Sequence, residues 1–121
     1  MLLICPLRCF GAEDSISLLI GGDIMLSRGV AKKIDTYGSG YLFKKISKLT
    51  NVADIRVANL ECVLTDRAPE RFQQFRFPAK PSSVDTLKAG RWNLLSVANN
   101  HALDCGPLGL LDTVTYLKRS D

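Results

Sequence analysis

The sequence predicts an α/β fold with a mainly parallel sheet. Three short apolar runs have the length and composition of buried strands, and helical patterns separate them. Each run stops at side chains with oxygen or nitrogen ligands, at 23, at 59–61 and at 99–104. Parallel strands joined by helices end at the same edge of a sheet. We therefore expect the three polar endings to meet at the carboxyl edge, where open α/β sheets bind ligands.

Length and composition indicate one globular unit. The 121 residues are 46% hydrophobic and 23% charged, which is enough apolar material for a core of moderate size. The net charge of +4 comes from scattered lysines and arginines, without the dense basic run that is typical of a nucleic-acid-binding arm. We therefore expect no nucleic-acid partner, although a basic rim would help to attract a polyanion.

The first strand is expected at about 15–21, where an apolar run leads into a Gly-Gly pair and then Asp23. Glycines at this point let the backbone turn tightly and approach a ligand. Asp23 would then be a metal-binding carboxylate at the strand end. The alternative is that Asp23 caps the helix that follows.

Two helices are expected before the second strand. The first covers 28–36 and ends at Tyr37, because two glycines shortly after it interrupt the pattern. The second covers about 41–50, where apolar side chains recur on one face. Arg28 and Arg67 are candidates to contact an anionic substrate, and the alternative for both is an ordinary surface charge.

The second strand covers about 54–59 and leads into Asn59 and Glu61. Glu61 is expected to offer its carboxylate to a divalent metal ion, and its alternative is a solvated loop carboxylate. Asn59 is either a metal ligand or a turn residue with local hydrogen bonds. The segment 62–81 contains three prolines and is expected to be a long loop, which would cover the site because loops of this length are often functional.

A third helix is expected from Ser82, which has capping-box spacing to Asp85, to a stop at Gly90. The third strand follows at 94–98. A last helix then has Pro107 in its first turn. It is expected to turn three apolar side chains inward: Leu110, Val114 and Leu117.

The third strand stops at the most informative cluster of the chain, which is Asn99, Asn100, His101 and Asp104; His101 is the only histidine. Asn100 would bind a metal through its amide oxygen, and His101 would act on the substrate as general acid or transition-state stabiliser. The alternative for this pair is a hydrogen-bonded structural role. Asp104 would either support the site from behind or cap the last helix. Mixed oxygen and nitrogen donors favour manganese, iron or zinc.

Four segments resemble the CapA family of capsule-synthesis proteins, which is related to the calcineurin-like metallophosphatases. They are GGDIML, ANLECVLTDR, FRFPAKPSSVDTLKAG and VANNHALDCGPLGLLDT. The resemblance covers about residues 16–118, and its most specific part is NNHALD. It implies a metallophosphatase-like layered α/β sandwich with a two-metal site.

By motif position, Asp23 matches the first metal-binding aspartate of that family. Glu61, with Asn59 nearby, stands where the bridging acidic ligand is expected, and Asn100 and His101 match the Asn-His pair of the third motif. The resemblance therefore implies the same metal ligands that the strand ends suggest.

The chain departs from the calcineurin-like phosphatases at two places. Met25 stands where they have a histidine, and the stretch 59–61 replaces their Gly-Asp pair. The resemblance implies capsule or poly-γ-glutamate synthesis or export, with a metal-dependent hydrolase acting on an anionic polymer or a phosphoester, beside other capsule-synthesis proteins. The alternative is a non-catalytic assembly or polyanion-binding module that retains a relic metal site.

Residues 15–121 are expected to be the N-terminal half of such a domain, because the family's domains are considerably longer. Residues 1–14 are expected to be a leader or a disordered segment, since they are apolar but lack a charged n-region. Such a leader would associate the protein with the membrane or cell envelope, and the alternative is a cytoplasmic location. Cys62 and Cys105 are expected either to approach one another at the rim or to be free buried thiols.

Overall fold

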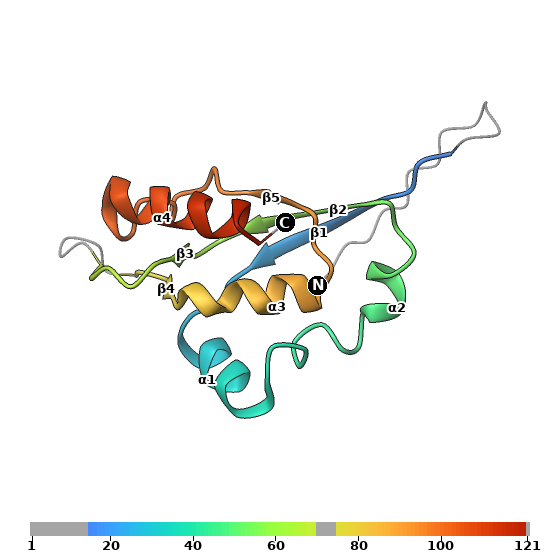
Figure 1. Cartoon of the computed structure of the whole chain (residues 1–121), viewed down its shortest axis with the longest axis horizontal. Helices are drawn as coiled ribbons and strands as arrows, with labels where there is room; N and C mark the ends of the chain where they lie inside the picture. Colours follow the sequence, from blue (N-terminus) through green and yellow to red (C-terminus); the bar gives the residue numbers. More distant parts are fainter. Residues whose placement is uncertain (1–14, 70–74, 121) are drawn as a thin grey trace.

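A small parallel sheet forms the centre of the structure, a computed structural model that describes residues 15–69 and 75–120. In these residues, three strands pair in the order β1-β2-β5, and both pairings are parallel. Their bounds are Leu18–Ile24 for β1, Ile55–Leu60 for β2 and Leu94–Ser96 for β5. The predicted α/β class with a parallel sheet is therefore confirmed (Figure 1). The predicted leader 1–14 lies outside the described residues.

Strand β1 differs from its prediction at both ends. The strand was expected to stop at the Gly-Gly pair, but it continues through both glycines, so that Asp23 lies inside the strand and opposite Asn59. The pairing with β2 shifts between Ile20 and Asp23, as at a β-bulge. A Cβ atom on Gly21 would lie 2.5 Å from the Trp92 ring, so glycine is required here for close packing.

Helix α1 covers Arg28–Tyr37 and ends where the sequence predicted, with Gly38 at a φ of 85°. The predicted helix 41–50 is wrong in extent, because only α2, Ser47–Thr50, is helical and residues 39–46 form successive turns. Leu42 and Phe43 pack against the core from these turns. Packing against the core has therefore overridden the helical period of the segment.

The predicted loop 62–81 contains a second, two-stranded parallel sheet in its described part. Strand β3, Val63–Leu64, pairs with β4, Pro78–Ala79. Both residues of β3 are almost completely buried, which a solvent-exposed loop would not allow. Residues 70–74 of the predicted loop lie outside the described residues.

A 3-10 turn, η1 at Pro81–Ser83, leads into α3, Val84–Ala89, which ends at Gly90 as predicted. The predicted capping box does not form, since no side chain of the described residues caps α3 and the residue before it is Ser83. The sequence spacing was right for a box, but the 3-10 turn shifts the start of the helix by two residues.

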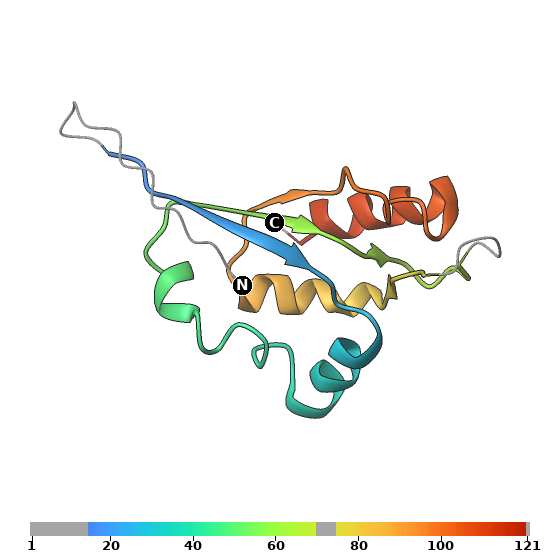
Figure 2. The same cartoon turned by 180° about the vertical axis from the view of Figure 1, so that it is seen from behind.

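Helix α4 covers Gly106–Lys118 and has its proline in the first turn, as predicted. Thr113 joins it to β3, because its hydroxyl accepts a 2.9 Å hydrogen bond from the Leu64 N–H. In both views, α4 lies on one side of β1 and β2, and α3 and α1 lie on the other (Figures 1 and 2). The largest side chains of the core are Leu26, Leu60 and Leu64. None of the described helices is long and apolar enough to cross a membrane.

Candidate functional site

Two carboxylates meet at the carboxyl edge of the sheet. Asp23, near the end of β1, lies opposite Asn59 in β2, and Glu61 follows β2 directly. The Asn59 amide donates one hydrogen bond to Asp23 Oδ1, at 2.9 Å, and another to Glu61 Oε2, at 3.1 Å. One amide therefore holds both carboxylates on the same rim.

The electrostatics of this rim favour a positive charge between the carboxylates. Partial burial raises the pKa of Glu61, and the neighbouring Asp23 carboxylate raises it further through hydrogen bonding and charge repulsion. The electrostatic interaction with His101 and the hydrogen bond from the Asn59 amide lower the pKa of Glu61 and so oppose this shift. The raised pKa means that a negative charge on Glu61 beside the Asp23 carboxylate is less favourable than on a free glutamate, and a nearby cation would offset this cost.

Asn99, which follows β5, belongs to the same network; the strand ends at Ser96 and not at 98 as predicted. Its Nδ2 group donates to Asn59 Oδ1, at 2.9 Å, and to the Leu60 carbonyl, at 3.0 Å. Its Oδ1 accepts from the His101 backbone N–H, at 3.0 Å. The sequence predicts Asn100, the neighbour of Asn99, as a metal ligand, and its side chain lies at the exposed surface. The adjacent Asn99 and Asn100 in the sequence indicate that an asparagine lies at the site, but they do not indicate which of the two side chains faces β2.

His101 lies in the turn between β5 and α4 and points toward the carboxylates. Its side chain is 12% exposed, and its Nε2 lies 3.8 Å from Glu61 Oε1. Its Nδ1 lies 2.9 Å from Asp104 Oδ2. Because a carboxylate can only accept, Nδ1 carries a hydrogen in this contact, and Nε2 is the ring atom that faces the rim. The ring also packs on Phe77, with centroids 4.2 Å apart.

Asp104 is completely buried behind His101. Its Oδ2 also accepts a 2.7 Å hydrogen bond from the Phe77 backbone N–H, whereas its Oδ1 has no partner among the described residues. The alternative of a helix cap is wrong, since the residue before α4 is Cys105 and no described side chain caps that helix. Asp104 therefore fixes the orientation of the imidazole and ties it to the segment that carries Phe77.

The remaining alternatives can be compared with the same geometry. Asp23 does not cap α1, because Ser27 precedes that helix and no described side chain caps it. The Glu61 side chain is only 23% exposed and contacts Asn59 and His101, so it is not a solvated loop residue. Asn59 makes its hydrogen bonds across strands rather than within a local turn.

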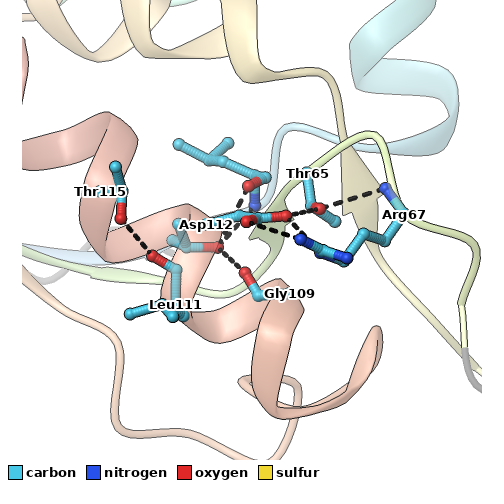
Figure 3. A network of polar contacts seen from close by, with 8 residues as sticks. Thr65, Arg67, Gly109, Leu111, Asp112 and Thr115 are labelled. Carbon is cyan, nitrogen blue, oxygen red and sulfur yellow. Dashed lines mark hydrogen bonds and ion pairs between the residues drawn. The ribbon is translucent and has the colours of Figure 1, made fainter.

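Arg67, one of the two arginines considered for anion binding, has a partner within the protein. Its Nε lies 2.7 Å from Asp112 Oδ2, which also accepts a 2.6 Å hydrogen bond from the Thr65 hydroxyl (Figure 3). Thr65 and Arg67 together lower the pKa of Asp112. Arg67 therefore joins β3 to α4 through Asp112 rather than facing the rim.

Cys62 and Cys105 are both buried, and neither forms a disulfide among the described residues. Burial raises the pKa of the Cys62 thiol to about 11. This agrees with the expectation of buried thiols and gives Cys62 no nucleophilic character near neutral pH.

The donors at the rim fit a divalent cation only in part. Within 15–69 and 75–120, no group of three or more His, Cys, Asp and Glu side chains is arranged to hold a metal ion. Asp23 and Glu61 nevertheless offer paired oxygen donors with unfavourable mutual charge, which is the chemistry that divalent cations satisfy. These residues fit one partly coordinated ion and do not by themselves complete a two-metal centre.

Comparisons with known proteins agree on one family. The family model described as "Bacterial capsule synthesis protein PGA_cap" matches residues 17–121. The chain is 28% identical over 113 residues to the capsule biosynthesis protein CapA of Bacillus anthracis, an alignment that covers 90% of this chain and 28% of the relative.

Two further relatives are similar at the same level. The PGA biosynthesis protein CapA of Bacillus subtilis is 29% identical over 105 residues, covering 85% of this chain and 28% of the relative. A probable polyglutamine synthesis accessory protein of Mycobacterium tuberculosis is 29% identical over 146 residues, covering 88% and 37%. The chain thus spans between 28% and 37% of the length of these three relatives.

Proposed function

The chain belongs to the bacterial capsule synthesis protein family PGA_cap, whose domain has the metallophosphatase-like fold, and from this premise we propose that it serves poly-γ-glutamate synthesis or export. Its membership confirms the resemblance predicted from the four sequence segments. The names of the relatives, which refer to capsule, PGA and polyglutamine synthesis, support the assignment to this process.

We propose further that the rim is a divalent-metal site. Asp23 and Glu61 would hold the ion, and Asn59 would orient both carboxylates through its amide. Asn100, the exposed neighbour of Asn99 in the sequence, is a further candidate ligand through its amide oxygen. The donor types suit manganese, iron or zinc. A bound ion would lower the pKa of a coordinated water and stabilise negative charge on a reacting oxygen.

His101 is the proposed acid–base residue. Asp104 holds its Nδ1–H, so that the opposite ring nitrogen points toward the carboxylates rather than into the protein. With a proton on Nε2, the imidazole can donate it to a leaving group bound at the rim. The substrate would be an anionic polymer or a phosphoester, and the reaction a hydrolysis.

One observation supports this proposal more than any other. His101 Nε2 lies 3.8 Å from Glu61 Oε1, and Glu61 shares the Asn59 amide with Asp23. Three strand ends thus bring an oriented acid–base group and a pair of carboxylates together at one edge. If His101 and Asp104 had only a structural role, the fold would not require His101 Nε2 to face the partly exposed Glu61 carboxylate.

The second candidate function is a non-catalytic module that binds a polyanion and assembles with other capsule-synthesis proteins. The absence of a three-ligand group from the part of the chain that the structure describes favours it. The two candidates differ in whether metal-dependent turnover occurs.

The test uses the whole chain, dialysed against Mn²⁺ or Zn²⁺ and assayed for bound metal by elemental analysis. Turnover is measured with a chromogenic phosphodiester and with poly-γ-glutamate. We expect Asp23→Asn and Glu61→Gln to weaken metal binding by about tenfold or more. His101→Gln should keep the metal and lose turnover. Asp85→Asn, which removes an exposed carboxylate from α3, is the matched control.

The outcomes separate the candidates. Metal binding with turnover supports the hydrolase. Polymer binding without turnover supports the assembly module. Metal binding that Asp23→Asn and Glu61→Gln leave unchanged would remove both residues from the ligand set.

We propose a cell-envelope location for this function, and fractionation of cells that produce the protein would test it.

A further inference from the structure

Arg28 lies on an aromatic platform that it shares with His101. Its guanidinium carbon is 5.1 Å from the centre of the Phe77 ring and 5.5 Å from that of Phe75. The Phe77 ring in turn packs on the imidazole of His101, with centroids 4.2 Å apart. The cation at the start of α1 and the acid–base residue therefore contact the same aromatic side chain.

The charge of Arg28 is not neutralised by the part of the protein that the structure describes. Arg67 pairs with Asp112, and Lys80 pairs with Asp35, but none of the ion pairs among the described residues includes Arg28. Its side chain is exposed. A guanidinium that lies against aromatic rings keeps its N–H groups available, so it can bind an oxyanion through two parallel hydrogen bonds.

The backbone at Arg28 is also unusual for an arginine. Its φ is +53°, in the left-handed region that glycine and asparagine adopt at lower cost. Strained backbone of this kind tends to persist where a side chain has a role, and a glycine here would relieve the strain. This strain agrees with a role for the side chain in the position that it occupies.

We propose that Arg28 is the anion-recognition residue of the rim, which binds an oxyanion of the substrate next to His101. The recognised group is a carboxylate of a glutamate polymer or a phosphoryl oxygen, since a guanidinium suits both. This inference rests on the proposed function only in taking the rim as the place where the substrate binds. It assigns different parts to the two arginines: Arg28 binds the ligand, and Arg67 joins β3 to α4.

The experiment measures binding of two probes to the whole chain, with and without Mn²⁺. The probes are a fluorescently labelled poly-γ-glutamate oligomer and inorganic phosphate. The variants are Arg28→Gln, Arg28→Lys and Arg28→Gly. The matched control is Lys33→Gln, which removes an exposed cation from the same helix together with its contact to the Tyr37 ring, 5.4 Å away.

We expect Arg28→Gln to weaken probe binding by about tenfold, the equivalent of one charge-assisted contact. Arg28→Lys should bind at an intermediate level, because it keeps the charge and loses the planar donor pair. Arg28→Gly should lose binding to the same extent while its thermal midpoint stays the same or rises. Lys33→Gln should change binding by less than about twofold. The probe that responds to Arg28 identifies the oxyanion.

Three results would overturn the inference. They are wild-type affinity in Arg28→Gln, an equal loss in Lys33→Gln, and no binding of either probe by the wild-type chain. Metal content separates this inference from the proposed function. Binding that depends on Arg28 in a chain without metal affinity would refute the metal site alone, whereas metal-dependent turnover that is indifferent to Arg28 would refute this inference alone.

Discussion

Replacing Asp104 tests most directly how the rim is held together. Both of its hydrogen bonds end on the same oxygen, Oδ2, which accepts from Phe77 N–H at 2.7 Å and from His101 Nδ1 at 2.9 Å. The other oxygen, Oδ1, is buried without a partner among the described residues. The two substitutions Asp104→Ala and Asp104→Asn therefore remove different things.

Asp104→Ala removes both hydrogen bonds and leaves two donors facing a cavity. Hydrogen bonds to a charged group contribute about 1.5–3 kcal/mol each, so we expect a loss of about 3–6 kcal/mol in the free energy of unfolding. Asp104→Asn can place its amide oxygen where Oδ2 was and keep both bonds. Each bond would weaken by about 1 kcal/mol without the charge, and removal of a buried charge would offset part of this. We therefore expect the asparagine variant to stay within about 2 kcal/mol of the wild type.

The measurement is urea unfolding followed by circular dichroism, with Asp85→Ala as an exposed control on α3. A loss below about 1 kcal/mol in Asp104→Ala would show that the two hydrogen bonds do not stabilise the fold. A loss in Asp104→Asn as large as that in Asp104→Ala would show that the site requires a carboxylate rather than a single acceptor oxygen, since the asparagine also buries an NH2 group at the position of Oδ1.

Three other predictions follow from single contacts. Gly21→Ala should destabilise the protein by about 1–3 kcal/mol, because its Cβ would overlap the tryptophan ring, whereas Gly22→Ala has open space and serves as its control. The pKa of Asp112 is lowered in the folded protein, so its carboxylate contributes stability above its ordinary pKa of 3.8. This stability is lost as the pH falls through the lowered pKa. Arg67→Gln should therefore reduce the acid sensitivity of the unfolding midpoint between pH 6 and pH 2. With a pKa of about 11 and a buried position, Cys62 should resist iodoacetamide at pH 8 in the native state and react after unfolding, as read by peptide mass analysis.

Each of these predictions has a contrary outcome. Equal stability of the two glycine variants would show that the tryptophan moves away without cost. An acid profile of Arg67→Gln that coincides with the wild type would mean that the hydroxyl of Thr65 alone accounts for the Asp112 shift. Rapid native-state alkylation of Cys62 would show that the core around it opens readily.

The fold class could be predicted from the sequence because the strands and α1 have clear periods. The second predicted helix failed for a physical reason. Leu42 and Ile46 have helical spacing, but the core draws Leu42 and Phe43 inward from separate turns. The Gly-Gly pair was also ambiguous, because glycine ends some strands and permits a bulge in others, and only the neighbouring Trp92 ring decides between these.

The members of the rim were predictable as a group, but their contacts were not. Strand ends that share an edge brought Asp23, Asn59 and Glu61 together, as the parallel topology required. The choice between Asn99 and Asn100 depends on which way the chain faces after β5, and a shift of one residue reverses it. The supporting role of Asp104 was one of its two predicted alternatives, but its contact with Phe77 was not predictable, because Phe77 is 27 residues away in sequence.

The contact between Gly21 and Trp92 gives the protein a built-in optical signal. Trp92 is the only tryptophan in the chain, and its ring packs against the bulge that sets the position of Asp23. The same ring lines a largely apolar pocket together with Asp23 and Ile24. A ligand at Asp23 that shifted the bulge would change the surroundings of the indole. We therefore expect a titration with Mn²⁺ to change the emission spectrum of Trp92 if the ion binds at Asp23, and this measurement needs neither a label nor a known reaction.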